Sequence, residues 1–117
     1  MIVCRKEAIS KEQVDQWLAD WEILRAEIHR SHAARDGKAK DIMQKGIDLY
    51  ETFIIKASNI TLESIQLSDE YEALPINGAE RLQFIKRRPG QYACYRQLDE
   101  LFIETKKRMA RLRLKKD

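Results

Sequence analysis

Apolar residues recur every three or four positions along the first part of the chain, which is the period of an α-helix. Over residues 11–35 they are Val14, Trp17, Leu18, Trp21, Leu24 and Ile28. Ser10 and Gln13 have the spacing of a capping box, which predicts that this helix begins directly after Ser10. Asp36 and Gly37 predict its end, because glycine readily adopts the left-handed conformation that stops a helix.

Two more long helices are predicted by the same pattern. The second spans about residues 38–58, with apolar positions at Ile42, Met43, Gly46, Ile47, Tyr50, Phe53, Ile54 and Ala57. The last spans about residues 91–114, with positions at Tyr95, Leu98, Leu101, Phe102, Thr105, Met109 and Leu112. Gly46 costs a helix about 1 kcal/mol relative to alanine. Close approach of a neighbouring helix would explain its presence.

The segment between the second and the last long helix predicts shorter elements. Thr61 is placed to cap a short helix over about residues 62–72, which Leu74–Pro75 would end because the residue before proline disfavours helical backbone. Asn77 and Glu80 then have the spacing of another capping box, which predicts a helix over residues 78–87 that ends at Pro89–Gly90.

These elements predict an all-α fold, arranged as an antiparallel helical bundle with three long helices and one or two short connecting helices. The short connection at Asp36–Gly37 makes the first two helices antiparallel neighbours. We expect one domain over residues 1–117, with residues 1–9 as an extended arm and residues 115–117 as a frayed basic tail.

The composition agrees with a helical domain and indicates the cellular compartment in which we expect the protein. The 117 residues are 44% apolar and include only 4 glycines and 2 prolines, which argues against a sandwich or barrel with its many turns. The first residues lack the apolar core of a secretory signal, and no apolar run approaches the length of about 20 residues that spans a membrane. Cys4 and Cys94 give no disulfide framework. We therefore expect a cytoplasmic protein.

Charge is distributed unevenly along the chain. Residues 1–58 are neutral overall, residues 59–80 carry a net charge of −5, and residues 81–117 carry +8. Within the basic part, we predict a binding surface around the Pro89–Gly90 corner. Its candidate residues are Arg81, Arg87, Arg88, Tyr92 and Arg96.

Guanidinium groups bind carboxylates and phosphates through paired hydrogen bonds, so two kinds of partner fit this surface. The first is a protein with an acidic surface. The second is nucleic acid, bound without sequence specificity through the same face and the basic C-terminal run, with an aromatic ring stacked on a base. A third interpretation needs no partner, because the acidic segment over residues 59–80 would cover the basic face.

Two histidines are the metal-ligand candidates. His29 and His32 lie one turn apart on the first helix, and a site would need further ligands such as Asp41, Asp48 or Glu51. The alternative is that both imidazoles are solvated near the end of the helix. We find no phosphate-binding loop and no catalytic constellation, so the sequence predicts no catalytic residue, no cofactor and a non-enzymatic role.

The stretch from Leu74 to Leu98 also resembles a known family. Its pattern is Leu74-Pro75-x-Asn77-x-x-Glu80-Arg81-Leu82-x-Phe84-Ile85-x-x-Arg88-Pro89-x-x-Tyr92-x-x-Tyr95-x-Gln97-Leu98. It is similar to the YpoC-like proteins of Gram-positive bacteria. The resemblance implies a bacterial origin and a small cytosolic protein with a non-enzymatic role, and it transfers no catalytic or ligand residues.

The sequence thus favours a small cytosolic interaction or adaptor module that binds an acidic protein through the basic face. Non-specific nucleic-acid binding is the alternative, and a metal protein or enzyme built on His29 and His32 is the third hypothesis. The oligomeric state stays open. Trp17 and Trp21 lie one turn apart, and they belong either to the core or to the seam of a homodimer.

Overall fold

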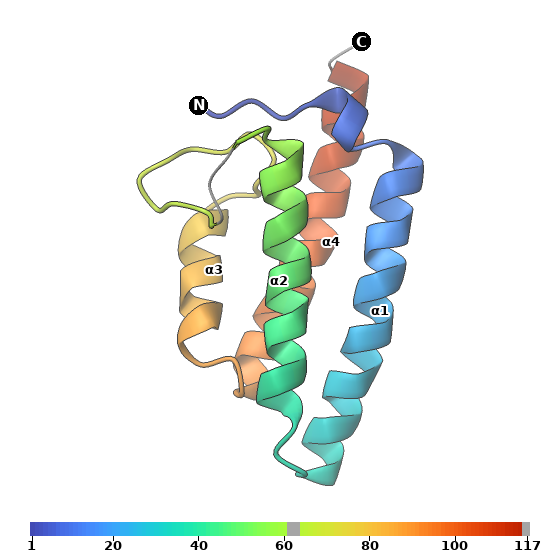
Figure 1. Ribbon diagram of the computed structural model, residues 1–117, viewed down its shortest axis with the longest axis vertical. Coiled ribbons are helices and arrows are strands. Elements are labelled where there is room, and N and C mark those ends of the chain that lie inside the picture. Colours follow the sequence, from blue (N-terminus) through green and yellow to red (C-terminus); the bar gives the residue numbers. More distant parts are fainter. Residues whose placement is uncertain (61–63, 116–117) are drawn as a thin grey trace.

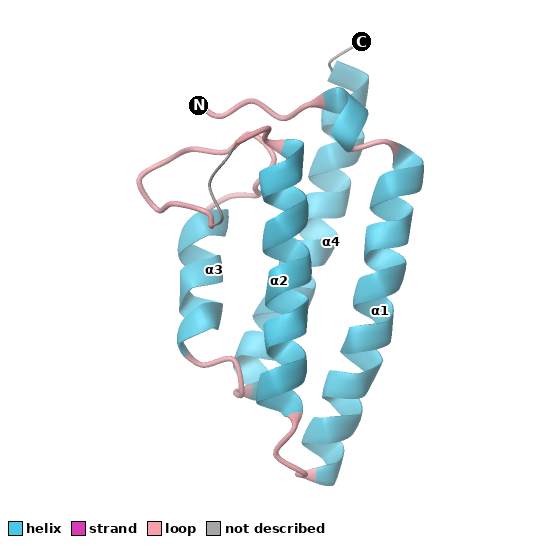
Figure 2. Ribbon diagram, viewed as in Figure 1, coloured by secondary structure: helices cyan, strands magenta, loops and turns pink. Residues whose placement is uncertain are grey.

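The structure is a computed structural model that describes residues 1–60 and 64–115. Within these ranges the chain forms four α-helices and one short 3-10 turn (Figures 1 and 2). The elements are η1 (Lys6–Ala8), α1 (Lys11–Ala34), α2 (Ala39–Ala57), α3 (Gly78–Arg87) and α4 (Tyr92–Lys115). No β-strand occurs in the described ranges apart from one isolated bridge, so the all-helical prediction is confirmed.

The three long helices lie side by side along the longest axis of the molecule (Figure 1). The molecule measures 47 × 30 × 22 Å along its three principal axes. The shorter α3 contacts α2 and α4. The turn from α1 to α2 and the turn from α3 to α4 lie toward one end of the molecule, which we call the turn end. Both chain termini and the connection from α2 to α3 lie at the other end, the termini end (Figure 1).

The predicted start of α1 is confirmed. The Ser10 hydroxyl accepts a hydrogen bond from the backbone N–H of Gln13 at 3.2 Å, and the Gln13 side chain accepts one from the backbone N–H of Ser10 at 3.2 Å. The helix ends at Ala34, because Arg35 adopts the left-handed conformation with φ 52°. Gly37, also left-handed with φ 78°, belongs to the following turn and does not itself stop the helix.

The capping box predicted for Asn77 and Glu80 is wrong, although α3 spans the predicted residues. Asn77 has left-handed backbone with φ 55°, and its side chain makes no capping hydrogen bond. A tight turn explains this conformation, because the N–H of Gly78 donates to the carbonyl of Pro75 at 2.9 Å.

The short helix predicted over residues 62–72 is also wrong for residues 64–72, which form turns and bends, while residues 61–63 lie outside the described ranges. Side chains take the N–H groups that a helix would use. The N–H of Ile65 donates to Glu51 at 2.8 Å, and that of Gln66 donates to the Tyr71 hydroxyl at 3.0 Å.

Residues 1–9 pair with this connection. The N–H of Ile2 donates to the carbonyl of Glu70 at 2.7 Å, and the carbonyl of Ile2 accepts from Glu72 at 2.9 Å, which makes the bridge between Ile2 and Tyr71. Cys4 is buried beyond the bridge, and its backbone is bonded to the Glu72 side chain. The first residues are therefore packed on the molecule.

Two stacked rings form the centre of the core. Trp21 and Phe102 stack with centroids 4.4 Å apart and planes 3° from parallel. Trp17 lies against Phe102 at 4.6 Å. Both tryptophans are almost completely buried in this single chain, so they are core residues. The thiol of Cys94 is buried as well.

In the described part of the chain, no helix combines the length and the apolar character that crossing a membrane requires.

Candidate functional site

A sharp reversal after α3 builds the candidate surface. Arg87 is the last residue of α3, and Arg88 leaves the helical conformation with φ −141°, as expected before Pro89. The N–H of Gln91 then donates to the carbonyl of Arg88 at 3.1 Å. The reversal brings the C-terminus of α3 next to the first turns of α4.

Four side chains at this reversal form what we call the basic corner: Arg87, Arg88, Tyr92 and Arg96. All three arginines are exposed, and none of their side chains forms an ion pair or hydrogen bond with any residue that the structure describes. Tyr92 is 48% exposed. Residues 86–98 contain four basic residues and no acidic one, so nothing in the local sequence neutralises the corner.

Arg81 lies away from the basic corner, and its side chain is hydrogen-bonded within the molecule. It lies in the first turn of α3, close to the termini end, and its guanidinium forms two hydrogen bonds with Glu104 of α4, at 3.1 and 2.5 Å. It also donates to the carbonyl of Ile76 at 3.2 Å. The hydrogen bonds with Glu104 raise the pKa of Arg81 and lower the pKa of Glu104. Arg81 therefore joins α3 to α4 and is not grouped with the other candidates.

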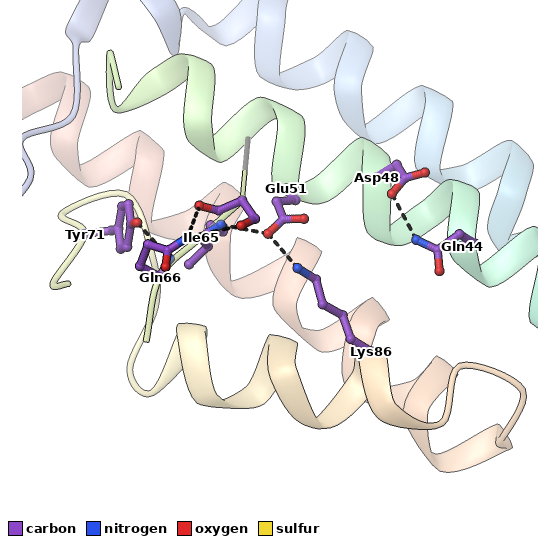
Figure 3. Close-up of polar contacts among 8 residues, drawn as sticks. Gln44, Asp48, Glu51, Ile65, Gln66, Tyr71 and Lys86 are labelled. Atoms are coloured by element: carbon purple, nitrogen blue, oxygen red, sulfur yellow. Dashed lines mark hydrogen bonds and ion pairs between the residues drawn. The ribbon is translucent and has the colours of Figure 1, made fainter. Parts of the chain in front are cut away.

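The side chain of Lys86 is likewise paired with an acidic residue of the same molecule, as Figure 3 shows. Its ammonium group reaches from α3 to Glu51 of α2, at 2.7 Å. Glu51 is 8% exposed and also accepts the backbone N–H of Ile65. The ion pair fixes α3 on α2, and the hydrogen bond from Ile65 fixes the connection that precedes α3 on the same carboxylate. Only part of the basic charge in the sequence therefore faces solvent at the corner.

The acidic segment does not cover the basic corner in the residues that the structure describes. The segment of residues 69–72 lies beside the first residues of the chain at the termini end, whereas the turn from α3 to α4 lies at the turn end (Figure 1). The backbone carbonyl of Glu72 accepts a hydrogen bond from Arg108, in the second half of α4. The length of α3 thus separates the acidic segment from the corner.

A further basic residue next to the corner was missed from the sequence. A Cβ added at Gly90 would lie 3.5 Å from the Cβ of Lys40, in the first turn of α2. Lys40 is exposed, and it extends the positive surface toward the turn between α1 and α2. No local pattern predicts this placement, because Lys40 and Gly90 lie 50 positions apart in the sequence.

The histidines are not joined by the ligands considered for a metal site. Among the described residues, no three His, Cys, Asp or Glu side chains are close enough together to hold a metal ion. Asp48 instead accepts from Gln44 at 3.0 Å, and Glu51 pairs with Lys86. His32 packs edge-on against Tyr92 with ring centroids 5.3 Å apart, so His32 borders the basic corner.

Together, these features define an all-helical protein with an exposed basic corner at one end, whose arginines pair with no acidic side chain of residues 1–60 and 64–115. Comparison with known proteins gives its family: the model of the YpoC-like proteins matches residues 11–117, and the chain belongs to that family.

Among curated proteins, the chain is similar to the "Uncharacterized protein YpoC" of Bacillus subtilis (strain 168). The two are 60% identical over 37 residues, which are 32% of this chain and 23% of that protein. The matched part is therefore under a quarter of the relative's length. No solved structure matches the chain.

Proposed function

We propose that this protein is an antiparallel helical bundle that acts as a cytoplasmic, non-enzymatic adaptor and binds an acidic protein segment on its basic corner. One observation carries the proposal. Arg87, Arg88 and Arg96 are exposed without an acidic partner among the described residues, although Arg81 and Lys86 nearby in the sequence are paired within the molecule.

The chemistry of the corner suits carboxylates. Each guanidinium offers a planar fork that binds a carboxylate through two parallel hydrogen bonds. Tyr92 adds a half-exposed ring with an apolar body and a polar tip, a type of side chain enriched at binding hot spots. The local excess of positive charge also speeds the approach of an acidic partner, and salt weakens this effect.

Charge reversal at the corner tests the proposal. The probe is a fluorescein-labelled oligoglutamate peptide, and its binding is measured by fluorescence anisotropy at low ionic strength. We expect the variant R87E/R88E to bind the peptide at least about tenfold more weakly, which corresponds to ~1.4 kcal/mol. Its melting temperature should stay close to that of the unmodified protein, because both side chains are exposed and make no described polar contact.

The matched control is K106E/K107E, which changes the net charge equally on an exposed part of α4 away from the corner. This variant should bind the peptide nearly as well as the unmodified protein. Equal loss in the two variants would show that net charge alone attracts the peptide, and this result would overturn the proposal.

Nucleic acid is the second candidate, and the exposed ring of Tyr92 beside arginines favours testing it, because such a ring can stack on a base. It would use both the basic corner and the C-terminal run. These regions lie at opposite ends of α4, and Arg113 in the run is bonded to the carbonyl of Ile9 at 2.9 Å. A labelled single-stranded oligonucleotide that bound tightly, and whose binding both variants weakened, would favour nucleic acid over an acidic protein.

A further inference from the structure

A recess between α1 and α4 adjoins the basic corner. It consists of two neighbouring hollows of about 260 and 330 Å³. The first is lined by Glu22, Arg25, Ala26, His29 and Tyr95, and the second by His29, His32, Ala33 and Tyr92. His29 lines both hollows, so they form one recess, which we call the imidazole recess. Tyr92 belongs to the recess and to the basic corner, so the two surfaces are continuous.

His32 has an unmet bonding capacity in the recess. Its ring lies edge-on to Tyr92 and 6.1 Å from the ring of Tyr95. Its Nε2 atom is buried and has no hydrogen-bond partner among the residues that the structure describes. Leaving a buried polar atom without a hydrogen bond is unfavourable. Since this atom is buried, an acceptor reaches it only by displacing a neighbouring side chain such as the half-exposed Tyr92, and it then accepts a hydrogen bond once the nitrogen carries a proton.

The fixed charges around the imidazoles leave a small excess of negative charge. From α1, the Arg25 guanidinium lies 3.3 Å from Glu22, and its Nε lies 3.2 Å from Asp99 of α4. Asp99 also accepts the indole N–H of Trp21 at 2.9 Å, which fixes its position. Burial raises the pKa of Tyr95, so this phenol adds no charge near neutral pH.

The net charge of the recess therefore depends on its histidines. Two carboxylates and one guanidinium leave about one negative charge when both imidazoles are neutral. Two added protons make the recess positive by about one charge. Imidazole is the side chain that ordinarily changes charge between about pH 5 and pH 8. In the adjoining basic corner, Arg96 and, beside Gly90, Lys40 stay positive throughout this range.

We propose that the imidazole recess is a second binding site for the acidic segment, and that it binds a carboxylate of that segment through protonated His29 and His32. This inference rests on the proposed function, since the basic corner holds the rest of the segment. Each imidazolium takes its proton from water and donates it in a hydrogen bond to the incoming carboxylate. Binding of the acidic segment therefore tightens as the pH falls from about 8 to about 6.

The test measures affinity for the oligoglutamate peptide at about pH 8 and about pH 6. The peptide stays ionised over this range, because the ordinary pKa of a glutamate side chain is about 4.3. The unmodified protein should bind at least about tenfold more tightly at the lower pH. The variant H29Q/H32Q should lose this difference, because glutamine keeps a polar side chain but cannot take up the proton.

Two controls separate this inference from the proposed function. The variant R87E/R88E should bind more weakly at both pH values but keep the tightening on acidification. The variant K106E/K107E should keep both the affinity and the tightening. Protein that binds the peptide equally well at both pH values, or H29Q/H32Q with the full tightening, would overturn the inference and leave the basic corner in place. Absence of binding at both pH values would overturn the inference and the proposed function together.

A second measurement does not depend on the folding of a variant. Proton NMR of the unmodified protein follows the imidazole signals as the pH is changed. Added peptide should shift the titration of both histidines to higher pH, because a bound carboxylate favours the charged ring. Titrations that are the same with and without the peptide would contradict contact in the recess.

Discussion

The missing side chain of Gly46 sets how closely the long helices pack. A Cβ at this position would lie 2.7 Å from the Trp21 ring and 3.2 Å from a methyl group of Leu98. Trp21 cannot easily yield, because its ring stacks on Phe102 and its indole N–H is bonded to Asp99. The glycine weakens α2 locally but allows α1 and α4 to approach it.

Replacing Gly46 with alanine should therefore destabilise the protein, although alanine is the better helix former. The gain in helix propensity is about 1 kcal/mol, and overpacking a tight core costs about 1–3 kcal/mol. We expect G46A to lower the free energy of unfolding by about 1 kcal/mol in urea titrations followed by circular dichroism. The control K45A, at an exposed position of the same helix, should change it by less than about 0.5 kcal/mol. A G46A protein more stable than the unmodified one would contradict this account.

Individual residues also show why only part of the candidate binding surface could be predicted from the sequence. Arg87, Arg88, Tyr92 and Arg96 lie within ten positions of the chain and around one turn, so local sequence was enough to group them. Arg81 looked equivalent from the sequence. Whether an arginine faces solvent depends on its tertiary partner, and Glu104 lies 23 positions away. Local patterns carry no information about such a pair.

At the scale of elements, the helices with long apolar stripes were predicted to within one or two residues of their bounds. The stripes and the Ser10 cap are local signals, and tertiary packing reinforces them. In the connection from α2 to α3, the short helix predicted over residues 62–72 is wrong for residues 64–72, because distant groups hold this segment. Glu51 takes the N–H of Ile65, and Ile2 pairs with the backbone around Tyr71.

The cap of α1 gives a test at this scale. The variant S10A removes the acceptor for the N–H of Gln13, and it should lower the free energy of unfolding by about 1 kcal/mol. Replacing Ser10 with aspartate keeps an acceptor at the cap, so S10D should retain most of the stability. Chemical denaturation of the three proteins compares them, and equal loss in both variants would exclude capping as the cause.

For the molecule as a whole, ion pairs and hydrogen bonds make stability depend on pH. They lower the pKa of three carboxyl groups: Arg81 acts on Glu104, Lys11 acts on Asp15, and Ser31 acts on Asp36. A carboxyl whose pKa is lower in the folded state binds protons more readily in the unfolded chain. Its contribution to stability is complete above the ordinary pKa, about 4, and is lost as the pH falls through the folded value.

We therefore expect the free energy of unfolding to change little from this source between about pH 7 and pH 5 and to fall below about pH 4. Glu104 gives a test, because it joins α4 to Arg81 of α3. The variant E104Q should be less stable at neutral pH by at most about 1 kcal/mol, since the carboxylate is partly exposed. Urea titrations across this range should show the difference shrink in acid. A difference that stays constant with pH would contradict the ion pair as its source.

The burial of both cysteines has a consequence for following the protein's motions. A thiol-specific reagent cannot reach either sulfur until the structure around it opens. The Cys4 thiol becomes accessible when the first residues detach from Tyr71, whereas the Cys94 thiol becomes accessible only when α4 leaves the core. The labelling rate of Cys4 therefore reports local detachment of the first residues, and the labelling rate of Cys94 reports opening of the helical core.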